Sequence, residues 1–169
     1  MLDFSQLDKY KENNRIEAKK AQGGLPRSIW ETYSAFANTF GGYILLGVVE
    51  NADKSFSSVP LPSPETLVAD FWNSVNNTAN VSVNILSERN VQIVESGGNR
   101  IVVVEVPRAD RHDKPVYIGT DPFAGSYRRN GEGDYRCTKD EVRAMMRDQA
   151  DISQDARVMD TMTTDVFDM

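Results

Sequence analysis

Apolar positions between residues 25 and 50 first follow a helical period and then become continuous. Four large apolar side chains recur at spacings of four, three and four residues: Ile29, Tyr33, Phe36 and Phe40. This spacing places them on one side of an α-helix. Pro26 suits the first turn of that helix, where no backbone N–H donor is needed. The pattern therefore predicts a helix that begins near Leu25 and buries one face.

A glycine pair separates this helix from the next element. Asn38, Thr39 and then Gly41-Gly42 are typical of a helix end, because glycine adopts the left-handed conformation without a Cβ clash. The nearly continuous apolar run from Tyr43 to Val49 predicts a strand buried on both faces, and Glu50 ends it. We expect this helix, turn and strand to form the centre of the fold.

The other elements follow from shorter patterns. Ser63 followed by Pro64 predicts the start of a second helix, and Thr138 with Glu141 forms a capping box for a last helix from Lys139 to about Ala150. The remaining apolar runs predict strands at Arg15–Ala21, Val81–Ile85, Val91–Ile93, Ile101–Val106, Val116–Ile118 and Ser126–Arg129. The clustered order of these elements indicates an α+β fold: a mixed, mainly antiparallel sheet with about three helices packed on it.

Length, composition and charge indicate how the chain divides into domains. The 169 residues, 40% of them hydrophobic, suit one domain at residues 1–150. The net charge is −6, but five acids and one base in residues 151–169 account for −4 of it. We expect that segment to be an acidic linker or the start of a C-terminal region that is missing here. The single cysteine, Cys137, excludes an internal disulfide, and the absence of a long apolar run or signal peptide predicts a cytoplasmic protein without a membrane contact.

Several short motifs together resemble the Schlafen AlbA-like DNA-binding domain. They are Glu17-Ala18-Lys19, Ser34 to Gly42, Gly47 to Glu50, Val104 to Pro107 and Tyr127 to Gly131, within a match from about Glu12 to Asp140. The resemblance implies an α+β module that binds nucleic acid, with DNA as the favoured ligand. In bacteria such modules commonly stand at the N-terminus of predicted transcriptional regulators and helicase-related proteins. The chain departs from the family where it has Val49-Glu50, since the family often has two aspartates there.

The resemblance also implies an alternative activity, metal-dependent cleavage of RNA or another nucleic acid. The family's three catalytic acids match Glu12, Glu17 and Glu50, with Asp53 as a substitute for the last. Clustered carboxylates bind Mg²⁺ or Mn²⁺, which polarise a phosphate and activate water. The alternative is that these acids are solvated or paired with neighbouring bases, in which case no cofactor is needed.

Basic residues on predicted strand ends and loops favour the binding function. They are Lys19, Lys20, Arg108, Arg111, Lys114, Arg128 and Arg129. On one face they would contact phosphates, whereas scattered over the surface they would only be solvated. A protein-interaction domain is a third hypothesis. The sequence is compatible with homo-oligomerisation and with binding of either DNA or RNA.

Overall fold

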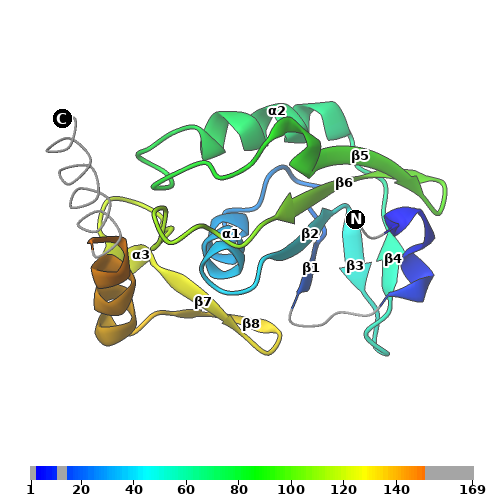
Figure 1. Ribbon diagram of the computed structural model, residues 1–169. Helices are drawn as coiled ribbons and strands as arrows, with labels where there is room; N and C mark the ends of the chain where they lie inside the picture. The colour runs from blue at the N-terminus through cyan, green and yellow to red at the C-terminus, as the bar shows by residue number, and fades with distance from the viewer. Residues whose placement is uncertain (1–2, 11–14, 151–169) are drawn as a thin grey trace, which may run out of the picture.

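The computed structural model describes residues 3–10 and 15–150, and a four-stranded sheet lies at its centre (Figure 1). The strand order is β1 (Ile16–Lys19), β2 (Gly42–Leu46), β6 (Asn99–Val106) and β5 (Val91–Ser96). β1 runs parallel to β2, and the two other pairings are antiparallel. The predicted α+β class with a mainly antiparallel sheet is therefore confirmed.

Two helices cover one face of the sheet. α1 (Ile29–Asn38) and α2 (Pro64–Val75) pack on alternate residues of the central strands, among them Ile44, Leu46 and Val102. Tyr33, Phe36 and Phe71 are fully buried in this layer. Burial of one such side chain contributes roughly 1.5–3 kcal/mol, so this layer is a main source of stability.

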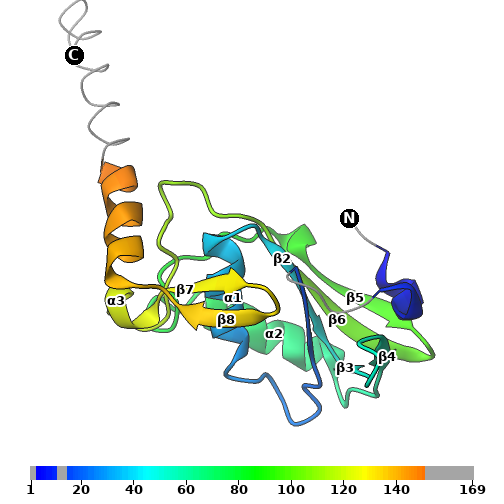
Figure 2. The same cartoon turned by 90° about the horizontal axis from the view of Figure 1, so that it is seen from below.

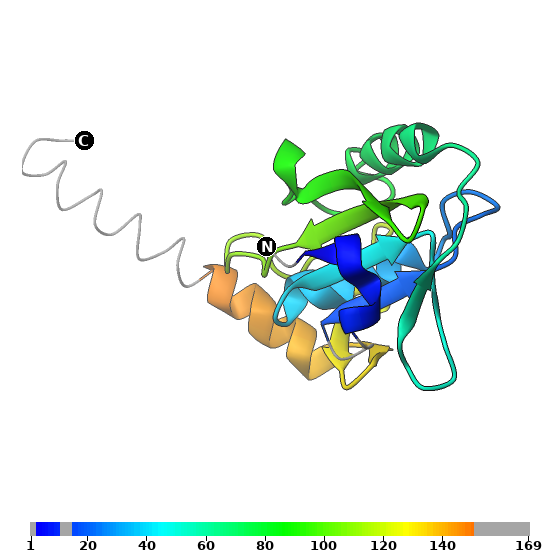
Figure 3. The ribbon, with the colours of Figure 1, turned by 90° about the vertical axis from the view of Figure 1, so that its right-hand side faces the viewer.

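The opposite face is covered by shorter elements. The 3₁₀ helix η1 (Phe4–Lys9) and the hairpin of β3 (Val48–Glu50) and β4 (Phe56–Ser58) lie there. Figure 3 shows η1, in dark blue, in front of the sheet. Leu45 and Val103, which alternate with the helix-facing positions of β2 and β6, fill this second core.

A separate hairpin packs on α1. It consists of β7 (Tyr127–Asn130) and β8 (Gly133–Arg136), and it lies beside α1 in Figure 2. The short helix α3 (Pro122–Gly125) precedes it, η2 (Glu88–Asn90) precedes β5, and residues 139–150 form a further helix. Within the described part of the chain, no helix is long and apolar enough to cross a membrane.

The local helix signals are mostly confirmed. The Ser63 hydroxyl accepts a hydrogen bond from Thr66 N at the start of α2. At the last helix the Thr138 hydroxyl accepts from Glu141 N, and the Glu141 carboxylate accepts from Thr138 N at 2.7 Å. The first helix, however, begins at Ile29, so Pro26 lies in the preceding turn rather than in the helix.

Three strand predictions need correction. The run from Tyr43 to Val49 is not one strand, because Gly47 has a φ of +87° and separates β2 from β3. That turn sends β3 out of the central sheet to pair with β4. Residues 81–85 and 116–118 form only isolated bridges, including one between Val81 and Ile118. Some of their backbone N–H groups donate instead to side chains, Ile85 N to Tyr33 and Val116 N to Asn38, a tertiary effect that alternation does not reveal.

Candidate nucleic-acid interface

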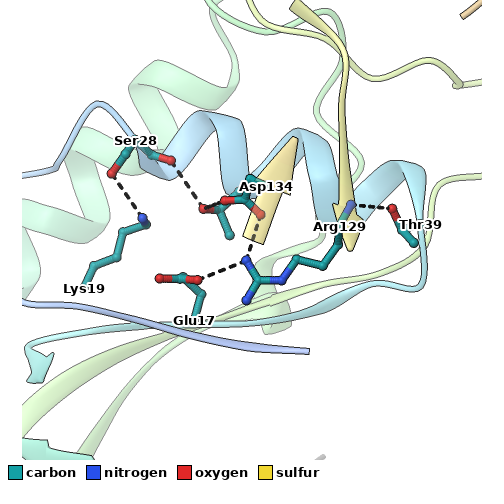
Figure 4. Close-up of polar contacts among 7 residues, drawn as sticks. Glu17, Lys19, Ser28, Thr39, Arg129 and Asp134 are labelled. Carbon is teal, nitrogen blue, oxygen red and sulfur yellow. Dashed lines mark hydrogen bonds and ion pairs between the residues drawn. The ribbon is translucent and has the colours of Figure 1, made fainter. Parts of the chain in front are cut away.

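Arg129 is the most buried of the predicted phosphate-binding residues. Its side chain is only 2% exposed, and Nη1 lies 3.0 Å from Glu17 Oε1 and 2.7 Å from Asp134 Oδ1 (Figure 4). The strand register places Arg129 opposite Asp134, and the guanidinium lies 4.9 Å from the centre of the Phe36 ring. The sequence predicts an exposed phosphate contact here, whereas the structure places this charge between two carboxylates inside the protein.

The polar residues around the Arg129 side chain come from three different elements. Glu17 lies on the edge strand β1, Asp134 on β8, and Thr32 of α1 donates a 2.6 Å hydrogen bond to Asp134 Oδ2. We call Glu17, Thr32, Arg129 and Asp134 the Arg129 clasp. Burial raises the pKa of Glu17, while the charges of Lys19 and Arg129 act in the opposite direction. The clasp joins the β7–β8 hairpin to the helix and to the sheet edge.

The structure describes only three of the four predicted acidic residues. Glu12 lies outside the described residues, Glu50 is exposed at the end of β3, and Asp53 is exposed and accepts a hydrogen bond from Ser55 N. In residues 3–10 and 15–150, no group of three or more His, Cys, Asp or Glu side chains is placed to hold a metal ion. Metal-dependent cleavage thus stays a prediction.

The other predicted cations lie on three separate segments of the chain. Lys19 donates a 3.1 Å hydrogen bond to the Ser28 hydroxyl, and Lys20 is exposed just beyond β1. Arg128 Nε lies 3.2 Å from Glu141 Oε1 in an ion pair without hydrogen-bond geometry. These residues do not share a segment with Arg108, Arg111 and Lys114, which all lie on the loop after β6.

The loop at residues 107–115, called here the basic loop, is attached to the end of α1. Ala109 N donates a 2.8 Å hydrogen bond to Ala37 O. Arg108 and Arg111 are exposed, while Lys114 is partly buried. Burial and then the charge of Arg108 lower the pKa of Lys114, and Asp148 opposes them. The loop therefore holds cations close enough to repel one another.

Asn38 is a positioning residue that the sequence pattern does not identify. Its amide nitrogen donates to Val116 O at 2.9 Å and to Tyr127 O at 3.0 Å, and its amide oxygen accepts from Val116 N at 2.8 Å. As expected from the sequence, the helix ends at Asn38, and the side chain of this residue also joins two distant segments. Nothing in its local sequence indicates these partners.

Phe40 is also placed differently from the prediction. The helical period puts it on the buried stripe, but 60% of its surface is exposed. α1 ends at Asn38, and Thr39 has φ −114° and ψ −98°, so the chain leaves the helical path before Phe40. Arg15 Nη2 donates a 2.9 Å hydrogen bond to the Phe40 carbonyl. An exposed aromatic ring thus lies at the turn that the basic loop contacts.

Comparison with known proteins agrees with this fold. The family model described as Schlafen, AlbA_2 matches residues 9–138, which is most of the chain. The chain belongs to this family. The family membership expected from the motifs is therefore confirmed.

A solved structure is also similar. The solution NMR structure of the N-terminal domain of a Nitrosomonas europaea protein, described as related to the ATP-dependent DNA helicase RecG, is 36% identical in sequence. The match covers 78% of this chain and 88% of that chain, with a TM-score of 0.56. No curated protein matches the chain.

Proposed function

We propose that this Schlafen AlbA_2 domain binds nucleic acid, with DNA as the first candidate, as a module of a transcriptional regulator. The observation that carries the proposal is the basic loop, with exposed Arg108 and Arg111 beside Lys114. The family and the helicase-related neighbour support a role connected with nucleic acid. Arginine and lysine contacts to phosphates are the usual source of such affinity.

The electrostatics of the basic loop favour an anionic ligand. Burial lowers the pKa of Lys114, and the charge of Arg108 lowers it further. A bound phosphate would offset the repulsion between the two cations. The loop also carries two acids, Asp110 and Asp113, which leave it with one more base than acid. Asp110 lies 3.5 Å from His112, which lowers the pKa of Asp110.

A charge-matched pair of variants tests this proposal. The double variant Arg108→Ala/Arg111→Ala removes two cations of the basic loop. The control Lys54→Ala/Arg100→Ala also removes two cations, each of which is paired with an exposed glutamate elsewhere. Fluorescence anisotropy with a labelled DNA duplex should show affinity falling at least about tenfold in the first variant and little in the second. Equal affinities in both variants would contradict the proposal.

We expect binding without metal-dependent cleavage. The guanidinium of Arg129, 3.0 Å from Glu17, already neutralises that carboxylate and would repel a divalent cation beside it. Labelled RNA and single-stranded DNA incubated with Mn²⁺ should therefore stay intact. Cleavage that EDTA abolishes and that Glu17→Gln eliminates would instead support the nuclease hypothesis.

A further inference from the structure

Phe40 exposes a large aromatic surface on a short turn. Among the described residues it is the most exposed large hydrophobic side chain, at 60%, ahead of Tyr135 at 53%. An exposed phenylalanine forgoes the free energy that burial would contribute. Single exposed apolar residues are common, so the exposure alone implies nothing further. The surroundings of Phe40 indicate a role for its ring.

The backbone on both sides of Phe40 is held by several contacts. Gly41 N donates a 2.7 Å hydrogen bond to Phe36 O, and Arg15 donates to the carbonyl of Phe40 itself. The Thr39 hydroxyl accepts a 2.9 Å hydrogen bond from Arg129 N. The ring is therefore carried by a backbone with little freedom, which reduces the entropy lost when a ligand packs on it.

Gly41 places the basic loop against this turn. A Cβ atom at Gly41 would lie 2.7 Å from Val106 O and 3.0 Å from Arg108 N, so only glycine permits this approach. The φ of Gly41, +74°, is also a conformation that favours glycine. Together with the hydrogen bond from Ala109 to Ala37, this contact brings the backbone of Arg108 beside the residue that follows Phe40.

We infer that Phe40 is a stacking platform for one unpaired nucleobase of a single strand whose adjacent phosphates bind Arg108 and Arg111. The inference rests on the proposed function and adds that the nucleic acid is single-stranded. An aromatic face beside a cationic groove is the combination that single-strand-binding proteins use, because every base has a π-face to stack. In a duplex the bases are stacked on each other and offer no free face to this ring.

The exposed Tyr135 provides a contrast within the same protein. Its cross-strand neighbour on the β7–β8 hairpin is Arg128, whose charge is paired with Glu141. Tyr135 therefore has an exposed ring beside a neutralised cation, while Phe40 lies beside the basic loop. Comparing Tyr135 with Phe40 therefore distinguishes the effect of an exposed aromatic ring alone from the effect of such a ring beside the exposed cations of the basic loop.

The test compares four proteins with three probes. The probes are a single strand of about 20 nucleotides of mixed sequence without hairpins, made as DNA and as RNA, and the corresponding DNA duplex. The proteins are the wild type, Phe40→Leu, Phe40→Trp and Tyr135→Leu. Because both aromatic rings are exposed, the variants should unfold at nearly the wild-type temperature, which circular dichroism checks. We expect Phe40→Leu to lose about tenfold or more in affinity for the single strands while its duplex affinity changes less than about twofold.

Phe40→Trp should retain single-strand binding, and Tyr135→Leu should match the wild type with every probe. If the wild type binds nucleic acid and Phe40→Leu binds every probe with the same affinity, the inference is overturned and the proposed function stands. If the wild type binds neither strand nor duplex, both fail. If Phe40→Leu instead abolishes self-association in sedimentation without altering DNA or RNA binding, the ring is a protein contact and the inference is overturned.

Discussion

Arg129 donates a 2.7 Å hydrogen bond to Asp134, its cross-strand neighbour on the β7–β8 hairpin. The same nitrogen, Nη1, lies 3.0 Å from Glu17 on the edge strand β1. A charge that is 2% exposed and has two carboxylate partners is not available to a phosphate in solution. Its neighbour Arg128 is 36% exposed and faces the other side of the hairpin. Two adjacent arginines in one motif therefore have different roles.

Substitution of these two arginines should affect stability very differently. Arg129→Met leaves Glu17 and Asp134 without their shared cation, and removal of one partner of a buried ion pair costs about 3–5 kcal/mol. Arg128→Ala breaks only a partly exposed pair with Glu141, which costs less than about 1 kcal/mol. Urea unfolding followed by circular dichroism measures both values. Equal losses of unfolding free energy would show that the Arg129 clasp does not stabilise the hairpin.

Glu17 should give the stability a recognisable pH dependence. The pKa of Glu17 is raised above 4.5 in the folded protein, so the folded state takes up this proton more readily than the unfolded state does. The stabilisation that comes from protonating Glu17 in the folded state is complete below about pH 4.5 and is lost as the pH rises through the pKa of Glu17 in the folded protein. The unfolding free energy of the wild type relative to Glu17→Gln should therefore increase as the pH falls from about 7 towards 4.5. A relative decrease over this range would mean that the pKa is lowered instead.

Cys137 should be unreactive in the folded protein. It is 6% exposed, and burial raises the pKa of its thiol to about 11. At pH 8 only about a thousandth of such a thiol is thiolate, compared with roughly a quarter in the unfolded chain. Iodoacetamide labelling followed by mass spectrometry should be slow in buffer and fast in urea. Rapid labelling in buffer would show that Cys137 is accessible and that the packing around it is looser than described.

Much of the fold follows from local sequence. The apolar run of residues 101–106, the Ser63 cap and the Thr138–Glu141 capping box each depend on neighbours in the chain, and each is confirmed. Gly47 is different, because its φ of +87° reflects a need to turn β3 away from the sheet. The apolar run around it looks continuous, so hydrophobicity alone hides the break. Where a tertiary requirement decides the backbone, the pattern is insufficient.

The candidate site was less predictable than the fold. Glu17 and Arg129 are 112 residues apart in sequence, and only the packing of the β7–β8 hairpin on α1 brings them together. The stripe that predicts burial of Phe36 also predicts burial of Phe40, but the helix ends two residues too early for that. The exposure of the Phe40 ring thus results from where α1 ends, and the pairing of Arg129 with Glu17 results from where the β7–β8 hairpin packs.

The dependence of DNA binding on salt tests the central claim most directly. Binding through phosphates releases counterions, so the affinity of the wild type should fall steeply and linearly on a log–log plot of affinity against salt concentration. Arg108→Ala/Arg111→Ala should reduce the magnitude of this slope by about 2, roughly one for each lost phosphate contact, and Lys54→Ala/Arg100→Ala should leave it nearly unchanged. Anisotropy titrations from about 50 to 300 mM salt measure the three slopes. A wild-type affinity that does not respond to salt, or three equal slopes, would contradict binding through the basic loop.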